Sequence, residues 1–333
     1  MFSNRTGRNS ILALALLGLL GCRVTSLPLW NPAAPVDDQD FEVKELRDVA
    51  YVPEASSFRQ TLDLFLPRSD EPFPVVILVH GGAWLIGDNR CCGLYPSVAK
   101  YLASRGIGVV VPNYRQSPWV RHPEHVKDLA RVVAWTRANI ARHGGTPERL
   151  FLAGHSAGGH LVSLLATDES YLRDEGLRAD LLAGVITISG VYEIPSGNLQ
   201  VTLGGAGDEG FRIDELMPIR DGPEPLVSGV LPEIPLSVNA FGHAFGNDEQ
   251  ARAAASPRTH VRTGLPPFLI MAAERDLPTF GGMACDFHAA LLQTGCDSRL
   301  LEIPGRNHNT IMFKAIDDDD PVAQAIVRFV QQH

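Results

Sequence analysis

The sequence predicts an α/β fold in which a mostly parallel central sheet is flanked by helices. From Val43 onward, apolar runs of strand length alternate with segments of helical period. Most of these runs are continuously apolar, as strands covered on both faces should be. The chain has 333 residues, of which 45% are hydrophobic and 20% charged, so it can bury a large core. We expect one large domain over residues 41–333.

The predicted strands follow one another in a regular order. Val43–Val52 and Thr61–Pro67 alternate between inward and outward positions and predict an early hairpin. The continuously apolar runs predict central strands at Pro74–His80, Gly108–Pro112, Arg149–Gly154, Leu181–Gly190 and Pro266–Glu274. One more strand is expected at Ser298–Gly305.

A helix and an insertion stand out between these strands. Val126, Leu129, Val133 and Ile140 fall at helical spacing, and this segment ends at a Gly-Gly pair at 144–145. Residues 193–255 break the rhythm, because they are rich in proline and glycine and have only short apolar pieces. We interpret this stretch as an inserted lid or cap within the domain.

The N-terminus has the layout of an export signal. Two arginines and no acid precede the apolar run Ile11–Leu20, which is too short to cross a membrane. The run leads into Leu-Leu-Gly-Cys at 19–22, which resembles the lipobox of bacterial lipoproteins and implies lipidation of Cys22. We therefore expect a signal peptide at 1–21 and a tether at 22–40, with the protein exported and anchored at a membrane facing the periplasm or cell exterior. An ordinary secretory signal, giving a secreted or periplasmic protein, is the alternative.

Net charge and cysteine content limit the possible partners, disulfides and metal sites. Lys and Arg number 29 against 38 Asp and Glu, which gives a formal net charge of −9 and disfavours nucleic acid as a partner. An oxidising compartment would permit disulfides among four further cysteines, whose pairing the sequence leaves open: Cys91, Cys92, Cys285 and Cys296. No CxxC pair occurs, so a structural zinc site is not indicated.

One serine lies where a nucleophile is expected. The segment Gly-His-Ser-Ala-Gly-Gly at 154–159 follows a predicted strand directly and precedes a stretch that can form a helix. This is the strand, sharp turn and helix of a nucleophile elbow, and it would leave Ser156 exposed above the sheet.

A second glycine motif follows the strand at 74–80. In His-Gly-Gly-Ala-Trp at 80–84, the N–H groups of Gly81 and Gly82 could form an oxyanion hole together with that of Ala157. A tight turn is the alternative for the glycine pair. Trp84 either lines the substrate pocket or packs beneath the lid.

Together these motifs resemble those of α/β-hydrolase-fold carboxylesterases with an HGG motif, which include the hormone-sensitive-lipase-like esterases. The pair HGGAW and GHSAGGHL is similar to acetyl-xylan or feruloyl esterase-like and kynurenine-formamidase-like members. Pro112–Pro118, His122–Trp135 and Ile188–Tyr192 support the resemblance, which covers roughly residues 41–192 and 256–330.

The resemblance implies a Ser, acid, His order along the chain. Asp276 lies just past the predicted strand at 266–274, which favours it as the acid over Glu274 at the strand's end. His308 lies in the loop behind the strand at 298–305 and is the expected base. His160 is one helical turn after Ser156 and is expected to pack beneath the elbow.

The function implied is that of a serine carboxylic-ester hydrolase acting on small or carbohydrate-linked esters, with no metal or organic cofactor. Two alternatives stay open. The chain could be an arylformamidase-type amide hydrolase, or a noncatalytic lipoprotein built on a hydrolase scaffold. The sequence does not indicate an oligomeric state.

Overall fold

The computed structural model describes residues 40–55, 57–197, 200–203 and 236–333. The predicted signal peptide with Cys22, all but the last residue of the predicted tether, and most of the predicted insertion lie outside these residues. Within them, no helix is both long and apolar enough to span a membrane.

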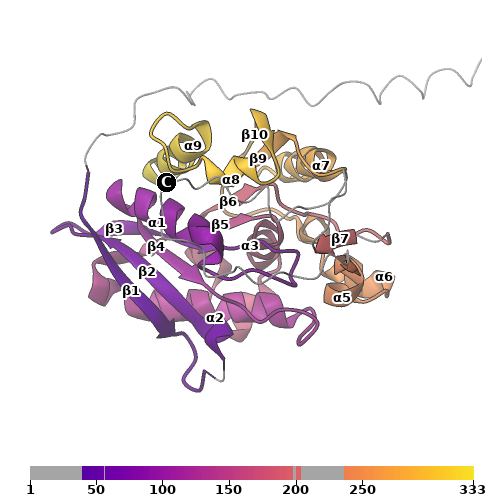
Figure 1. Cartoon of the computed structure of the whole chain (residues 1–333), viewed down its shortest axis with the longest axis horizontal. Coiled ribbons are helices and arrows are strands. Elements are labelled where there is room, and N and C mark those ends of the chain that lie inside the picture. The colour runs from indigo at the N-terminus through magenta and orange to yellow at the C-terminus, as the bar shows by residue number, and fades with distance from the viewer. Residues whose placement is uncertain (1–39, 56, 198–199, 204–235) are drawn as a thin grey trace, which may run out of the picture.

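A twisted sheet of eight strands forms the centre of the described domain (Figure 1), in the order β1-β2-β4-β3-β5-β6-β9-β10. β1 and β2 are antiparallel to their neighbours, and the other six strands run parallel. The predicted α/β class is confirmed. The strand bounds are β1 Val43–Ala50, β2 Thr61–Pro67, β3 Phe73–Val79, β4 Gly108–Pro112, β5 Gly145–His155, β6 Leu182–Ile188, β9 Phe268–Arg275 and β10 Ser298–Asn307.

The predicted hairpin at the start of the domain is present, but its second strand does not alternate. β1 is an edge strand with a mixed burial pattern, whereas every residue of β2 after Thr61 is buried. The reason is that both faces of β2 are covered: Leu62, Leu64 and Leu66 enter one hydrophobic core, and Phe65 enters the other. The polar residue of this strand, Asp63, is buried as well.

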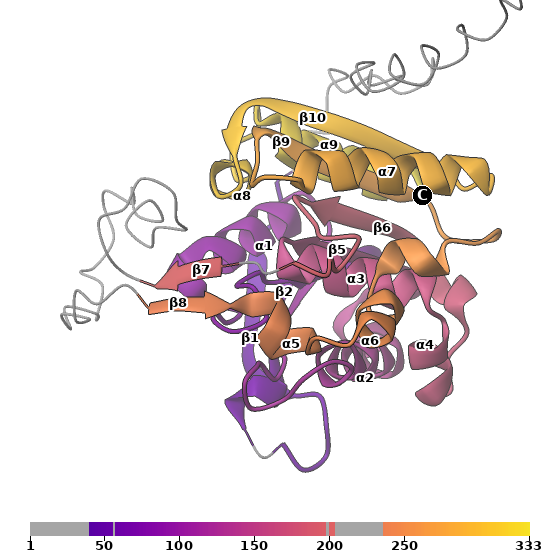
Figure 2. The ribbon, with the colours of Figure 1, turned by 90° about the vertical axis from the view of Figure 1, so that its right-hand side faces the viewer.

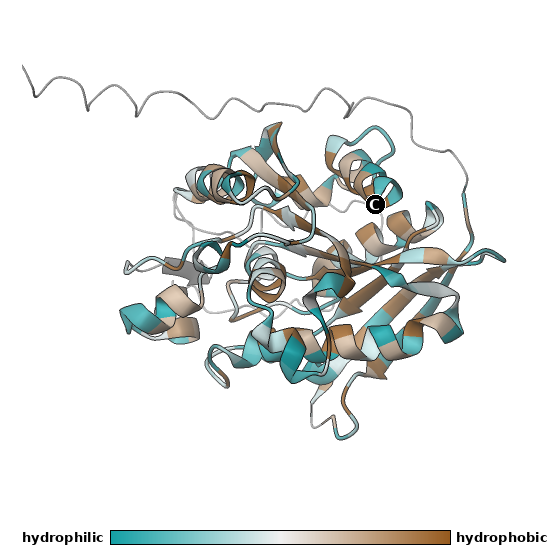
Figure 3. Cartoon of the chain, turned by 180° about the vertical axis from the view of Figure 1, so that it is seen from behind, coloured by the Kyte–Doolittle hydropathy of each residue, from teal (hydrophilic) through white to brown (hydrophobic). Residues whose placement is uncertain are grey.

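Helices cover both faces of the sheet. Alternate residues of β3 enter two separate cores, with Val75 and Ile77 in one and Val76 and Leu78 in the other. The first core is completed by α2, α3 and α7, and the second by α1 and α9. Figure 3 shows this pattern: the strands are mostly hydrophobic, and the helices carry both hydrophobic and hydrophilic residues. The bounds are α1 Leu94–Ser104, α2 Glu124–Asn139, α3 Ala157–Thr167, α7 Phe280–Gln293 and α9 Pro321–Gln332.

The described ends of the predicted insertion form short elements. β7 (Gln200–Leu203) pairs with β8 (Leu236–Asn239) in an antiparallel ribbon, and α5 (Ala240–Phe245) and α6 (Glu249–Ala254) follow. Figure 2 shows β8 leading directly into α5. Two further short helices are α4 (Ser170–Asp174) and α8 (Thr310–Phe313).

The strand order brings distant loops together. β4 and β5 lie on opposite sides of β3, so the chain changes direction across the sheet at this point. Val79 at the end of β3 pairs with Gly154 near the end of β5, which places the two loops that follow side by side. These loops carry the two glycine motifs.

Candidate active site

Ser156 occupies a strained turn between β5 and α3. Its backbone angles are φ 54° and ψ −118°, a region that residues with a Cβ rarely adopt. The turn is held by the Ser156 N–H, which donates to Ile188 O at 2.9 Å. A Cβ on Gly158 would lie 2.2 Å from the Val79 carbonyl oxygen, so only glycine fits behind the elbow.

The structure brings the three residues predicted as nucleophile, base and acid into one chain of hydrogen bonds. His308 Nε2 lies 2.9 Å from Ser156 Oγ, and His308 Nδ1 lies 2.7 Å from Asp276 Oδ1. A carboxylate only accepts hydrogen bonds, so Nδ1 carries the ring proton and Nε2 accepts from the serine hydroxyl. The side chains come from three loops, which follow β5, β9 and β10.

Asp276 is held by more than the histidine. Ser189 Oγ donates to its Oδ2 at 2.5 Å, and the Leu277 N–H donates to its Oδ1 at 2.8 Å. Burial acts to raise the pKa of Asp276, but the hydrogen bond and charge of His308 and these further donors outweigh it, so the pKa lies below its usual value. Ser189 was not predicted from the sequence.

His155 helps to position His308, the predicted base. Its Nε2 donates to the backbone oxygen of His308 at 2.8 Å, and the two rings lie 4.9 Å apart. Burial and the charge of His308 lower the pKa of His155 to about 3, although its hydrogen bond to the His308 carbonyl and the charge of Asp276 act to raise it, so this ring is neutral at neutral pH. The Phe280 ring meets His308 edge to face at 5.2 Å.

The predicted oxyanion donors require one correction. The Gly81 N–H already donates to Tyr95 Oη at 2.7 Å, inside the protein, so it is not available to a substrate. Within the described part of the chain, the N–H groups of Gly82, Ala83 and Ala157 donate no hydrogen bond. Gly82 has φ 116° and a Cβ there would lie 2.0 Å from Ile86 O, so the loop is also the tight turn considered as the alternative.

Trp84 packs into the core. Its side chain is only 1% exposed, and it contacts Phe241 and Phe245 of α5. Its indole N–H donates to His160 Nδ1 at 3.3 Å. This geometry favours the packing alternative over a substrate-lining role for Trp84.

The competing titratable residues have other partners. Glu274 lies on β9 and accepts from the Gly305 N–H at 2.7 Å. His160 is fully buried, and its Nε2 donates to Ala255 O at 2.8 Å. Neither residue takes part in the hydrogen bonds that join Asp276, His308 and Ser156, as predicted.

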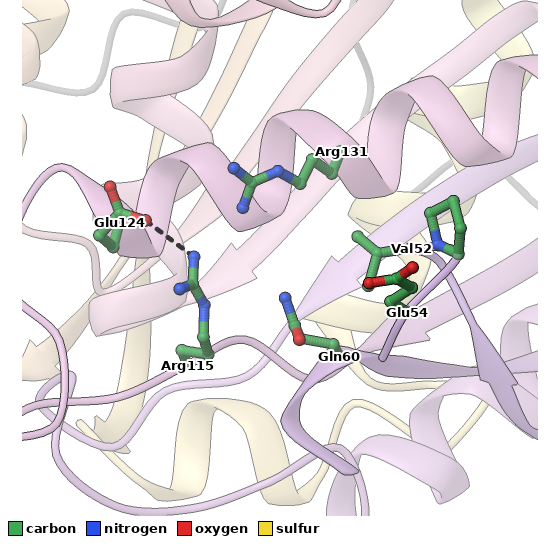
Figure 4. Close-up of a pocket in the computed structure, with 7 residues that line it drawn as sticks. Val52, Glu54, Gln60, Arg115, Glu124 and Arg131 are labelled. Atoms are coloured by element: carbon green, nitrogen blue, oxygen red, sulfur yellow. Dashed lines mark hydrogen bonds and ion pairs between the residues drawn. The ribbon is translucent and has the colours of Figure 1, made fainter. Parts of the chain in front are cut away.

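Arg115, in one of the segments that carry the resemblance, belongs to a surface pocket. Its guanidinium binds Glu124 and Asp128 at 2.8 Å each. Figure 4 shows Arg115 and Glu124 pointing toward each other, and both line a pocket of about 550 Å³. Ser156 is not among the residues that line it, which are Val52, Pro53, Glu54, Gln60, Arg115, Glu124 and Arg131.

In the described part of the chain, no disulfide joins any of the four cysteines considered for pairing. The sulfur atoms of Cys91 and Cys92 lie 3.6 Å apart. Among the residues that the structure describes, no three His, Cys, Asp or Glu side chains form a metal-binding group.

The sequence is similar to those of proteins named as ester hydrolases. The BD-FAE family model matches residues 62–183. Two relatives from Mycobacterium tuberculosis are a probable carboxylic ester hydrolase, LipM, 30% identical over 206 residues, and the esterase LipC, 29% identical over 281 residues. The matches cover 61% and 82% of this chain, and 41% and 62% of the respective relative. The chain thus spans about half the length of these relatives.

Solved structures show the fold. A truncated carbohydrate esterase from gut microbiota superposes with a TM-score of 0.66 at 16% identity, covering 90% of this chain and 98% of the other. Esterase B from Lactobacillus rhamnosis gives 0.64 at 20% identity, covering 90% and 88%. The predicted α/β-hydrolase fold is confirmed.

Proposed function

We propose that this chain, an α/β-hydrolase related in sequence to carboxylic ester hydrolases, is a serine esterase in which Ser156 is the nucleophile, His308 the base and Asp276 the acid. The hydrogen-bonded chain from Asp276 through His308 to Ser156, with distances of 2.7 and 2.9 Å, is the observation that carries this proposal. A serine hydroxyl is a weak nucleophile unless an adjacent base takes its proton.

In the proposed reaction, His308 Nε2 removes the proton as Ser156 Oγ attacks the ester carbonyl. The ring becomes positively charged in this step, and the ionised Asp276 beside Nδ1 stabilises that charge. The same Nε2 then protonates the leaving alcohol. Water hydrolyses the acyl-enzyme by the reverse proton path and restores the serine.

Negative charge on the tetrahedral oxygen needs donors that the protein has not already used. We assign this role to the N–H groups of Gly82, Ala83 and Ala157, since the N–H of Gly81 is bound to Tyr95. The position of Ala157 at the first residue of α3 supports the assignment, because the dipole of the helix favours negative charge at its N-terminus.

Hydrolysis of p-nitrophenyl acetate by the purified protein tests the proposal. We expect Ser156→Ala to lower kcat by at least about 10³-fold, because it removes the nucleophile. Ser163→Ala is the matched control: this serine lies on the same helix and donates only to Gly159 O. Equal turnover by wild type and Ser156→Ala would refute the nucleophile. A folded but inert wild type would favour the binding-scaffold alternative.

For the substrate, we propose small or carbohydrate-linked esters. The match to the BD-FAE family and the fold shared with a carbohydrate esterase support this class. Acetylated xylan tests it through released acetate, again with Ser156→Ala as the control. Good turnover of simple esters without release of acetate would direct the search to other esters.

We also propose that the protein is exported and lipidated at Cys22, as its N-terminal sequence predicts. Expression in bacteria supplied with labelled fatty acid tests this directly. Wild type should take up label and partition into membranes, and Cys22→Ser should do neither. Cys285→Ser serves as the matched control.

A further inference from the structure

Two adjacent cysteines lie in a short turn between the loop at residues 81–83, here called the Gly82 loop, and α1. Cys91 and Cys92 begin the single 3₁₀ turn Cys91–Gly93, and both side chains are partly exposed. Their sulfur atoms face each other at 3.6 Å, within hydrogen-bonding range for thiols. Cys92 has φ 54° and ψ 19°, a left-handed conformation uncommon for this residue type.

This arrangement makes the two thiols unequal. The hydrogen bond from Cys91 lowers the pKa of Cys92 to about 7, although burial and Asp88 act to raise it. The same hydrogen bond, together with burial, raises the pKa of Cys91. Cys92 is therefore the thiol that loses its proton more readily, and the thiolate is the reactive form of cysteine.

We propose that Cys91 and Cys92 are a redox modification site, which a disulfide oxidant converts into a disulfide between neighbouring residues. The Cys92 thiolate attacks one sulfur of the oxidant, and the first thiolate leaves and takes up a proton from solvent. Cys91 then loses its proton and attacks Cys92 Sγ, which releases the second thiol. Two protein thiols are oxidised, one S–S bond forms, and one oxidant disulfide is reduced to two thiols.

The product should be easy to reduce again. Neighbouring Cα atoms are about 3.8 Å apart across a trans peptide bond, which is below the range of about 4.4–6.8 Å that disulfides usually span. Such strain favours reduction, and strained, exposed disulfides are the labile ones. The modification is therefore reversible.

A short path connects this pair to the proposed active site. Tyr95 lies three residues after Cys92, at the start of α1, and both thiols act electrostatically on its hydroxyl. That hydroxyl accepts the Gly81 N–H at 2.7 Å, and an ideal Cβ on Gly81 would be 3.1 Å from Ser156 Cβ. Formation of the disulfide would bring the two sulfur atoms from 3.6 Å to about 2.05 Å, and we expect Tyr95 and the loop at 81–83 to shift with the turn.

We therefore expect oxidation to lower esterase kcat/KM by about three- to tenfold. This is less than the loss of about 10²-fold or more seen when an oxyanion donor is removed, because the donors are moved and not deleted. The effect on rate rests on the proposed function, whereas formation of the disulfide does not.

Glutathione disulfide at neutral pH, with reversal by dithiothreitol, tests both parts. The first readout is the mass of the Cys91–Cys92 peptide, measured on Ser156→Ala so that it is independent of catalysis. We expect loss of two hydrogens in the parent, but only mixed disulfides in Cys91→Ser and Cys92→Ser. Cys285→Ser, which removes another partly buried cysteine, should behave like the parent.

The second readout is the turnover of otherwise wild-type protein before and after oxidation. A fall in kcat/KM that dithiothreitol restores, and that both Cys→Ser variants lack, supports the proposal. Unreacted thiols, or a mixed disulfide that never closes, would overturn the site. Closure with unchanged turnover would overturn its connection to the Gly82 loop. A wild type without any esterase activity would refute the proposed function, while the mass readout would still decide the site.

Discussion

Asp276 is held in the candidate site by several hydrogen bonds. Its carboxylate is buried and accepts hydrogen bonds from His308, Ser189 and Leu277. These donors hold the pKa of Asp276 below its usual value. The charged form is thus part of the folded structure, with consequences for stability as well as for the proposed chemistry.

Stability should respond to acid through this residue. Because the pKa of Asp276 is lower in the folded than in the unfolded chain, its stabilisation is complete above the unfolded value of about 3.9 and is lost as pH falls through the folded value. Asp276→Asn should cost about 2 kcal/mol at pH 7. The Tm difference from wild type should then shrink below about pH 4. The exposed Asp286→Asn is the control, and a constant difference from pH 7 to pH 3 would contradict this assignment.

Tyr95 is the second residue whose role the structure defines. Tyr95→Phe leaves the buried Gly81 N–H without its acceptor, which should cost about 1–3 kcal/mol of unfolding free energy in urea. If Tyr95 also positions the Gly82 loop, kcat should fall more than KM rises. Tyr101→Phe, on the same helix, provides the comparison. A Tyr95→Phe protein that is destabilised but keeps its full kcat would show a purely structural role.

At the scale of elements, a buried carboxylate ties the edge hairpin to the segment that leads into α1. Asp63 on β2 accepts from Arg47 of β1 at 2.7 Å and from Arg90 at 2.8 Å. It also accepts from the backbone N–H of Asp48 at 2.9 Å. Arg90 directly precedes Cys91, so this cluster also anchors the cysteine turn.

Removing that carboxylate should loosen the hairpin. Asp63→Asn weakens several charge-assisted hydrogen bonds at once, and we expect a loss of about 2 kcal/mol, moderated because the two arginines reach solvent. Urea unfolding of the variant, compared with the exposed Asp70→Asn, measures this. A change equal to that of Asp70→Asn would show that the cluster contributes nothing to stability.

A strand could be predicted from the sequence where its own run of apolar residues indicates that it is buried. β3, and β5 from Leu150 to Gly154, are continuous apolar runs because both faces of these segments are covered. The alternating pattern of β2 predicts an outward-facing Asp63, but Arg47 and Arg90 pair with its carboxylate, which is buried. Nothing local to the strand indicates those partners.

In the candidate site too, the local sequence indicates some residues, and tertiary packing alone reveals the others. Ser156, Asp276 and His308 could be found because each directly follows a strand of a parallel sheet, and such loops meet at one edge. Ser189 and Tyr95 could not, since their roles depend on how β6 and α1 pack against other loops. The packing of α1 also determines that the Gly81 N–H binds Tyr95 and is not free to bind a substrate.

At the scale of the whole molecule, the sheet assembles the site from distant parts of the chain. Ser156 and His308 are 152 residues apart in sequence, and 2.9 Å separates Oγ from Nε2. The hydroxyl, the base and the buried carboxylate are already in hydrogen-bonding order, so no large rearrangement is needed to activate the serine.

Covalent labelling by a serine-directed phosphonate tests the central claim most directly, namely that His308 activates Ser156. We expect one adduct per chain, located at Ser156 by peptide mass, no adduct in Ser156→Ala, and labelling of His308→Ala slowed by at least about 10²-fold. Ser163→Ala should label like wild type. Labelling of Ser156→Ala at the wild-type stoichiometry, or an adduct on another serine in the wild type, would contradict the account.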